Sequence, residues 1–338
     1  MFFSIETFAG TGKQGTDDGP AAKATFSLPR WIAVTPRGVV YVTEAFSNGI
    51  RKIENGIVST LVSREEGSVD GPLATARFRG PSGIVSDQAG NLYVADQSNH
   101  RIRKIDTSGN VTTIAGPQGV ERVQGWIDDL GDNALFSRPR GITIDAMDSN
   151  LYVSEHNRIR CIPLRLLQGR PSKFVRTVAA IGIAGFADGP ATVAQFDDPL
   201  DLAVTQTGDL LVADTGNLRI RHVSPSGTVT TVAGDGGRVS PTDKSPLTDR
   251  MPAMHARFEH PSGLAIDQFG TVWVGDGAYL RMYSPLTGTV STACSDAIDH
   301  KQPIEFERAT GIALSEGRVF VVDANKIMFL TPHNDIEA

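Results

Sequence analysis

Cysteine is nearly absent from this chain of 338 residues, which contains Cys161 and Cys294 and no others. The two lie far apart in the sequence, so they do not form the close cysteine pair of a zinc site. Two cysteines are also too few for a disulfide scaffold, and so low a count suits a reducing compartment. We therefore expect no disulfide framework; the compartment is left open, with the cytoplasm favoured.

Long apolar runs are missing as well. No stretch approaches the roughly 20 apolar residues that a membrane helix needs. The opening segment, MFFSIETFAG, lacks the basic region and the apolar core of a signal peptide. Helical periodicity is not sustained in any part of the chain. The sequence therefore predicts no membrane segment, no signal peptide and no long helix, and we expect a monomer.

Neither sign of charge dominates, because 32 lysines and arginines face 38 aspartates and glutamates, a formal net charge of −6. This balance argues against broad binding to nucleic acid or to anionic membranes, although it allows a local basic face. The sequence also lacks a G-x-S-x-G elbow, a P-loop and an H-E-x-x-H motif. Catalysis by a contiguous motif is therefore not indicated.

Glycine and proline are plentiful, at 35 and 19 residues, which favours many turns and many short strands. One pattern with a core of about 40 residues recurs six times along the chain. Its clearest copy reads FRGPSGIVSDQAGNLYVADQSNHRIRKIDTSGNVTTIAG. Each copy opens with a phenylalanine that we expect to pack between neighbouring units: Phe26, Phe78, Phe136, Phe196, Phe258 and Phe306.

Each copy divides into four short strands, a to d. In the second copy these are residues 83–85, 92–95, 101–105 and 111–114. They are rich in β-branched residues, alternate with a period of two and are separated by Gly and Asn turns. Repeated four-stranded units predict an all-β propeller, here with six blades.

The two ends of the chain complement each other. The last copy stops after its strand c, at residues 327–330, whereas residues 5–10 match strand d of the second copy, 111–116. We predict that the N-terminal strand, residues 5–9, pairs with the C-terminal strands a to c and closes blade 6. Residues 1–338 would then form a single domain.

The series P-x-G-I, G-N-L-Y-V-A-D and N-x-R-I-R resembles the NHL repeat, and residues 99–101 and 217–219 correspond to its Asn-His-Leu run. The resemblance implies a six-bladed propeller, but one fold hosts many functions. NHL-like propellers include protein scaffolds, RNA scaffolds and peptide-amidating lyases. Related six-bladed folds include calcium-dependent lactonases.

Two polar series recur once per copy and are therefore interpreted as structural. An acidic residue that can accept hydrogen bonds in its own turn ends each strand b. An arginine of strand c is expected to pair with it and to brace neighbouring blades. The acids are Glu44, Asp96, Glu155, Asp214, Asp276 and Asp323, and the arginines are Arg51, Arg101, Arg158, Arg219 and Arg281.

A third set departs from the repeat. The linkers between copies and the turns after strand b should share one face, the top face, where the innermost strands begin. Cations predicted there are Arg30, Arg79, Arg138, Arg140, His260 and Arg308, and variable loops add Phe46, Trp126, His156 and Tyr279. Arginine suits carboxylates and phosphates. The alternative is that these side chains are solvated, packed on neighbours or paired with acids such as Asp198.

The favoured function is a scaffold that binds a protein or peptide, including an acidic one, on the top face. One alternative is a metal-dependent lyase or hydrolase in the central channel, for which only Asp201 and His260 are plausible ligands. We predict no cofactor, and channel calcium or zinc belongs to that alternative. A second alternative is single-stranded RNA on the basic top face. Binding is thus favoured over catalysis.

Overall fold

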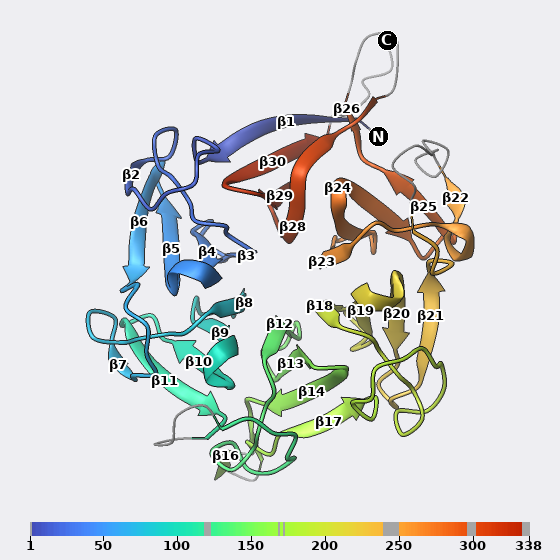
Figure 1. The fold of residues 1–338 in the computed structure, drawn as a ribbon, viewed down its shortest axis with the longest axis horizontal. Helices are drawn as coiled ribbons and strands as arrows, with labels where there is room; N and C mark the ends of the chain where they lie inside the picture. Colours follow the sequence, from blue (N-terminus) through green and yellow to red (C-terminus); the bar gives the residue numbers. More distant parts are fainter. Residues whose placement is uncertain are drawn as a thin grey trace.

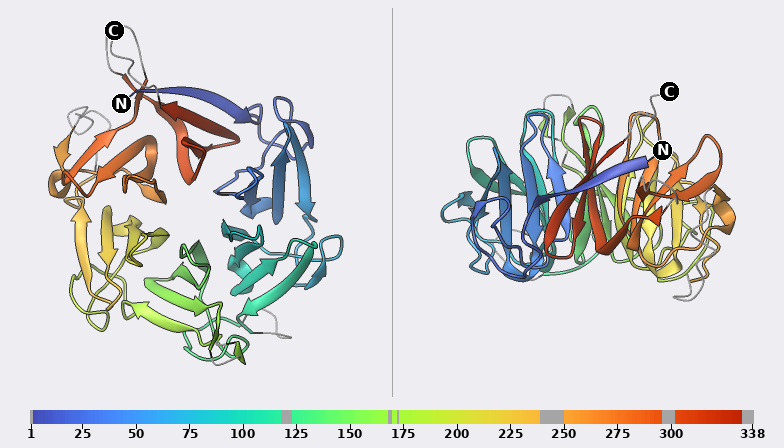
Figure 2. Two further views of the ribbon diagram at one scale, coloured as in Figure 1. Left: turned by 180° about the vertical axis from the view of Figure 1, so that it is seen from behind. Right: turned by 90° about the horizontal axis from the view of Figure 1, so that it is seen from above.

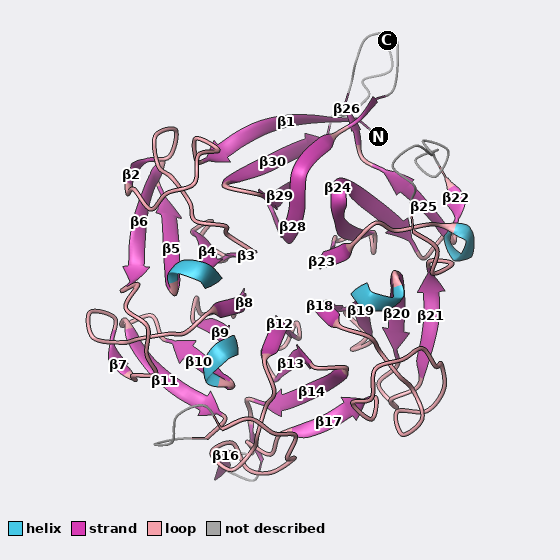
Figure 3. Ribbon diagram, viewed as in Figure 1, coloured by secondary structure: helices cyan, strands magenta, loops and turns pink. Residues whose placement is uncertain are grey.

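The computed structural model describes residues 2–117, 123–167, 170–171, 173–238, 250–295 and 302–332. Strands make up almost all of its regular structure (Figure 3). The helical segments are single 3-10 turns: η1 (Ala45–Ser47), η2 (Gln97–Asn99), η3 (Thr215–Asn217) and η5 (Ala253–His255). Within these residues no helix is long and apolar enough to cross a membrane. The prediction of an all-β fold is confirmed.

Four sheets have the predicted arrangement of consecutive antiparallel strands. The first contains β3 (Trp31–Val34), β4 (Val40–Glu44), β5 (Gly49–Glu54), β6 (Ile57–Val62) and β2 (Gly19–Pro20). The second contains β8 (Pro81–Ser86), β9 (Leu92–Asp96), β10 (Arg101–Ile105), β11 (Asn110–Ala115) and β7 (Gly71–Pro72). The third contains β12 (Pro139–Ile144), β13 (Asn150–Glu155), β14 (Arg158–Pro163) and β17 (Arg176–Ala179). The fourth contains β18 (Pro199–Val204), β19 (Leu210–Asp214), β20 (Arg219–Val223) and β21 (Val229–Ala233). A small ribbon, β15 (Leu166–Leu167) with β16 (Arg170–Pro171), lies beside the third.

The other strands form one 10-stranded sheet. One part of it has β23 (Pro261–Ile266), β24 (Val272–Ser284), β25 (Thr289–Thr292) and β22 (Met251–Pro252). The other part has β28 (Glu305–Ser315), β29 (Arg318–Asp323), β30 (Lys326–Pro332), β1 (Phe2–Ala9), β26 (Cys294–Ser295) and β27 (Gln302–Pro303). The two parts join because β24 pairs with β28 at Gly277–Ala309 and Tyr279–Glu305.

The N-terminal strand lies in the same sheet as the C-terminal strands. β1 runs antiparallel to β30, with Ile5 opposite Leu330 and Thr7 opposite Met328. Figure 1 shows β1 along the outer edge of this sheet, and Figure 2 shows the same strand from the side. β1 is therefore the outer strand of an array whose three inner strands come from the other end of the chain.

The sheets stand around a central axis as the blades of a propeller, with β3, β8, β12, β18, β23 and β28 nearest that axis (Figure 1). The core lies between adjacent blades. Phe78 of the second repeat, for example, clusters with Trp31 and Ile50 of the first sheet and with Ile84 and Val94 of the second. The repeated phenylalanines are therefore buried, as predicted: Phe26, Phe78, Phe136, Phe196 and Phe258 are 0% exposed, and Phe306 is 5% exposed.

Adjacent inner strands approach each other most closely at a layer of glycines. A Cβ atom on Gly263 would lie 2.0 Å from the Thr310 carbonyl oxygen, and one on Gly311 would lie 2.5 Å from that of Arg30. Only glycine fits such contacts without displacing the backbone. In the first and fourth sheets the matching positions instead hold Trp31 and Asp201, whose side chains line the channel. We call this layer the waist of the channel.

Candidate functional site

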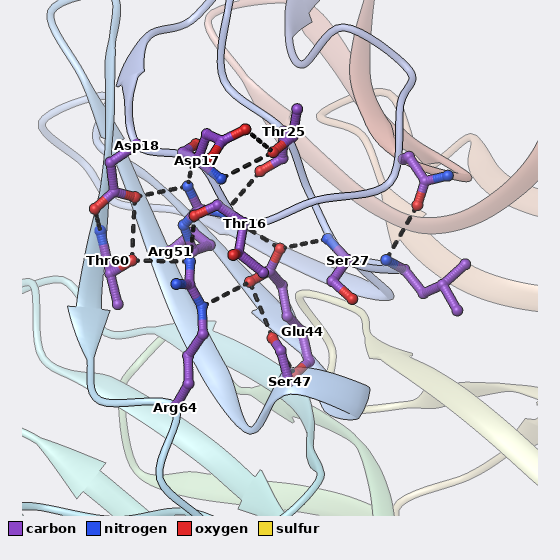
Figure 4. A network of polar contacts seen from close by, with 12 residues as sticks. Thr16, Asp17, Asp18, Thr25, Ser27, Glu44, Ser47, Arg51, Thr60 and Arg64 are labelled. Carbon is purple, nitrogen blue, oxygen red and sulfur yellow. Dashed lines mark hydrogen bonds and ion pairs between the residues drawn. The ribbon is translucent and has the colours of Figure 1, made fainter.

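The repeated acids and arginines form buried networks inside each blade, and Figure 4 shows that of the first blade. Arg51 is fully buried and donates to Glu44 at 3.3 Å and to Asp18 at 2.7 Å. Asp18 also accepts the backbone N–H of Thr60 on β6. One arginine therefore ties the linker that enters the blade to three of its strands.

The same network recurs around the ring. Buried ion pairs join Arg103 to Asp96, Arg160 to Glu155, Arg221 to Asp214 and Arg281 to Asp276. Linker aspartates add further pairs: Asp70 with Arg103, Asp128 with Arg160 and Asp188 with Arg221. The guanidinium groups also stack on the repeated phenylalanines, as Arg103 does on Phe78 at 4.7 Å. The structural interpretation of the acidic series is thereby confirmed for these blades.

The sequence assigned the pairing with these acids to the wrong arginine in three repeats. In each of them the predicted arginine lies two residues before the one that forms the ion pair. Arg101, Arg158 and Arg219 begin their strands and contact linkers, as Arg158 does at the Ile181 carbonyl. The Ile-Arg dipeptide at 50–51 aligns with residues 102–103, so Arg103 and its equivalents are the fully buried members that pair with the acids. They hold each blade's own linker, whereas the sequence predicted contacts between blades.

Arg30, Arg140 and Arg308 meet at one end of the channel, where the inner strands begin. Arg30 directly precedes β3, Arg140 lies in β12 and Arg308 lies in β28. Burial lowers the pKa of Arg30, and the charges of Arg308 and then Arg140 lower it further. These three residues, which we call the arginine mouth, are thus close enough to repel one another although they come from three different blades.

Two of the three charges have no acidic partner. Arg140 pairs with Asp198 at 2.5 Å. In the part of the chain that the structure describes, no ion pair engages Arg30 or Arg308. His260 lies at the same end, since burial and then Arg308 lower its pKa while Asp198 opposes that shift. The sequence therefore identified four residues that the fold brings together from distant positions.

The other predicted cations have local roles. Arg79 pairs with Glu66 at 2.7 Å, so its charge is offset within its own linker. Arg138 has an exposed side chain and a left-handed backbone with φ of 53°, and its N–H donates to His100 Nδ1 at 3.0 Å. His100 belongs to the preceding blade, so this bond joins two blades. Sequence reasoning had not assigned His100 a role.

The predicted aromatic residues separate into three places. Phe46 is 66% exposed and lies under the Arg30 guanidinium at 5.5 Å, so it extends the arginine mouth. Trp126, 48% exposed, stacks with Arg158 at 5.2 Å and His156 at 5.4 Å over another blade. Tyr279 is half-buried in β24, where burial and then Glu305 raise its pKa. Of these, Phe46 is the aromatic that contacts an arginine of the mouth.

Phe186 was missed by sequence reasoning. It is 47% exposed, and the Arg219 guanidinium stacks on its ring at 4.0 Å. It lies two residues before the linker aspartate Asp188, as Trp126 does before Asp128. Alignment of the linkers on those aspartates would have found it.

At the waist, Asp201 is 5% exposed and accepts the Leu264 N–H at 2.9 Å. Burial raises the pKa of Asp201 to about 7, and the N–H groups of Leu264, Leu202 and Trp31 oppose that shift. The Trp31 indole lies beside the Asp201 carboxylate on the wall of the channel. These two side chains narrow the channel below the mouth.

Beyond the waist the channel opens into a cavity of about 560 Å³ that is lined by residues of the inner strands, including Ile32, Ile84 and Ile142. A metal site needs several convergent ligands. The described residues contain no group of three or more His, Cys, Asp or Glu side chains placed to hold a metal ion. Asp201 and His260 therefore do not belong to such a group.

The NHL repeat family matches residues 78–105 and 196–223, which are strands a to c of the second and fourth blades. These two segments are therefore NHL repeats, as the resemblance predicted. It is 30% identical over 233 residues to the protein SUPPRESSOR OF QUENCHING 1, chloroplastic, of Arabidopsis thaliana, covering 65% of this chain and 22% of that protein. NHL repeat-containing protein 2 of Bos taurus is 28% identical over 58% of this chain and 32% of its own length.

Teneurin-3 of Mus musculus is 29% identical over 251 residues, 65% of this chain and 9% of its own length. The chain thus spans only a minor part of each of these relatives. Among solved structures, a protein of unknown function from Bacteroides thetaiotaomicron has a TM-score of 0.69 at 18% identity, covering 97% of this chain and 76% of that one. Virginiamycin B lyase of Staphylococcus aureus, in a structure with quinupristin, has a TM-score of 0.57 at 14% identity over 98% and 100%. These structures support the propeller fold.

Proposed function

We propose that this NHL propeller is a binding module that holds an acidic protein or peptide at the arginine mouth. The observation that carries the proposal is that Arg30 and Arg308 converge without an acidic partner among the described residues. The buried arginine of each network, by contrast, has a carboxylate at hydrogen-bond distance, as Arg221 has in Asp214 at 2.6 Å. Uncompensated guanidinium groups at the surface provide binding energy for an anion.

The position of the mouth supports the same function. Arg30 and Arg140 are half-buried, so their charges are less screened by water than those of a solvated side chain. Phe46 adds a large exposed ring beside Arg30, and arginine and aromatic residues are enriched among the side chains that dominate binding energy. The chain is acidic overall, so its net charge would not attract an acidic partner. The local patch at the mouth would therefore decide where such a partner binds.

We infer further that the ring has six blades and is closed by the N-terminal strand. Six inner strands support this count, and so does the pairing of β1 with β30. Asn325 in the last repeat accepts the N–H of Leu28 in the first at 3.1 Å, which adds a bond between the two ends of the array. A closed ring would fix the spacing of Arg308 and Arg30, which belong to the last and first blades.

The test compares two double variants with equal changes of charge in the same two blades. Arg30→Glu/Arg308→Glu changes the mouth, and Arg37→Glu/Arg318→Glu changes the opposite ends of the same inner strands. Fluorescence anisotropy with a labelled poly-glutamate peptide measures binding, and circular dichroism checks the fold. We expect the mouth variant to lose at least about tenfold in affinity, equivalent to 1.4 kcal/mol. Equal losses in both variants, or no loss in either, would overturn the proposal.

A further inference from the structure

We propose that the ligand of the arginine mouth is a phosphoryl dianion carried by a segment of the partner, such as a phosphorylated serine or threonine. This inference rests on the proposed function and names the anion within it. It starts from the number of charges at the mouth. Asp198 pairs with Arg140 at 2.5 Å, while Arg30 and Arg308 have no such partner in the described residues.

Two positive charges without acidic partners match the charge of a phosphate monoester better than that of a carboxylate or a phosphodiester. A phosphate monoester carries about −1.5 to −2 charges at neutral pH. One side-chain carboxylate carries a single charge, and so does each phosphodiester of a nucleic acid. A monoester would therefore neutralise Arg30 and Arg308 together, whereas a glutamate would leave one of them uncompensated.

The directions from which the arginines approach the mouth also favour a phosphate monoester. The arginines come from the first, third and last repeats, so they enter the mouth from different sides of the channel. A carboxylate offers two oxygens in one plane, which suits one or two guanidinium forks. A phosphoryl group offers three oxygens in a tetrahedral arrangement, and donors on several sides can reach it. Three converging arginines are thus more fully used by phosphate than by carboxylate.

The scaffold fixes the backbone at both arginines before any ligand arrives. The Arg30 carbonyl accepts the Gly311 N–H at 2.8 Å, which links the inner strands of the first and last blades. The Arg308 N–H donates to Asp323 at 2.8 Å, and the Arg30 guanidinium stacks on Phe46. The repulsion between the two arginines is therefore already present in the free protein, and a dianion would relieve it. Such preorganisation increases affinity because little freedom is lost on binding.

Two acids near these inner-strand starts, Glu66 and Glu259, are already engaged elsewhere. Glu66 pairs with Arg79, and Glu259 accepts the Ala278 N–H at 3.2 Å. Neither is therefore placed to serve both free arginines. The positive charge of the mouth is thus available to a ligand.

The experiment uses three degenerate peptide libraries that differ only in one central residue: phosphoserine, glutamate or serine. Binding of each fluorescein-labelled library to the whole chain is followed by anisotropy. We expect the phosphoserine library to bind at least about tenfold more tightly than the glutamate library, and the serine library to bind least. Arg308→Gln should remove most of this preference, and Arg318→Gln should keep it.

The competing outcomes are distinct. Equal binding of the phosphoserine and glutamate libraries would overturn the phosphoryl inference and leave the acidic-partner proposal standing. If no library binds and the poly-glutamate peptide also fails to bind, both proposals fall. Inorganic phosphate is added as a competitor; its displacement of the phosphoserine library supports the dianion chemistry. Stronger displacement by a single-stranded oligonucleotide than by phosphate would overturn the inference in favour of phosphodiesters.

Discussion

The molecule uses arginine in two opposite ways. Arg51, Arg103, Arg160, Arg221 and Arg281 are 0% exposed and lie within blades, each against a carboxylate and a phenylalanine ring. Arg30, Arg140 and Arg308 lie where blades meet at the channel, and only Arg140 has an acidic partner among the described residues. The first set recurs at one repeat position, whereas Arg30 and Arg140 share a second position and Arg308 holds a third.

This difference between buried and mouth arginines indicates where a repeat protein can form a binding site. A charge buried in every blade must be paired, since an isolated buried charge is very unfavourable. A charge at the mouth stays partly hydrated, so it can be present without a partner. The repeated position therefore stabilises the blade, and the position that varies between repeats is free to serve a ligand.

The last blade sharpens this comparison because it lacks the buried arginine. Its equivalent residue is Met328, whose sulfur accepts a contact from Thr7 Oγ1 at 3.5 Å. The blade gains instead the strand β1, and it packs Phe3 beside Trp273 at 5.4 Å. An apolar residue and a distant strand thus occupy the place that an ionic network holds in the other blades.

Deleting residues 2–9 should have the largest effect. The change removes the ladder with β30 and the buried side chains of Phe3 and Ala9. Loss of one buried phenylalanine side chain alone costs about 3–5 kcal/mol. Because the deletion also removes the ladder and the other side chains of β1, we expect a fall in Tm of at least about five degrees or no folded protein. Thermal unfolding by circular dichroism measures it. An unchanged Tm would contradict the proposed closure of the ring by β1.

Replacing a buried arginine should have the next largest effect. Arg103→Met leaves Asp96 buried without its cation, and we expect a loss of about 3–5 kcal/mol in the free energy of unfolding. Arg140→Met at the mouth is the matched control, and we expect it to change stability by less than about 1 kcal/mol. Urea unfolding compares them. Equal losses of unfolding free energy in the two variants would show that the buried arginines and the mouth arginines do not differ in their contribution to stability.

Asp201 provides a buried carboxylate that has no arginine partner among the described residues. Its pKa is raised to about 7 in the folded protein from 3.8, so folding favours the protonated form. This contribution to stability is fully present below pH 3.8 and is lost as the pH rises to about 7. We therefore expect Asp201→Asn, which does not titrate, to gain in Tm relative to the parent between pH 4 and pH 8.

Across this pH range the free energy of unfolding of Asp201→Asn should change relative to that of the parent by a few kcal/mol at most, at about 1.36 kcal/mol per pKa unit. Asp209→Asn, an aspartate of the same blade whose pKa is lowered, is the control and should show the opposite trend with pH. A parallel pH profile for Asp201→Asn and the parent would contradict the assignment. Melting curves across the pH range decide between these outcomes.

The smallest effect on stability should come from the mouth itself. Arg308→Gln removes a charge that repels Arg30, and we expect the free energy of unfolding to stay within about 0.5 kcal/mol of the parent or to rise slightly. Added salt should reduce any gain, because it screens the repulsion. A loss of more than about 2 kcal/mol would place Arg308 with the structural arginines.

The amino-acid sequence by itself determined the units of the fold. Turn residues, β-branched strands and the repeated Phe26 and Phe78 predict blades because these signals are local and recur in each copy. The roles of Asp96 and its equivalents followed from their constant position at the end of strand b. The arginine series was misaligned because Arg101 and Arg103 lie two residues apart on the same face of one strand, and only packing shows which of them pairs with Asp96.

Tertiary structure alone decided how residues from different blades meet. The sequence placed Arg30, Arg140 and Arg308 near the starts of the inner strands, but their mutual repulsion and the pairing of Arg140 with Asp198 depend on how the inner strands are spaced. The approach of Trp31 to Asp201 likewise follows from packing around the channel. Local hydrogen bonding fixes a strand from its own residues, whereas a site between blades depends on distances that all the packed sheets set together.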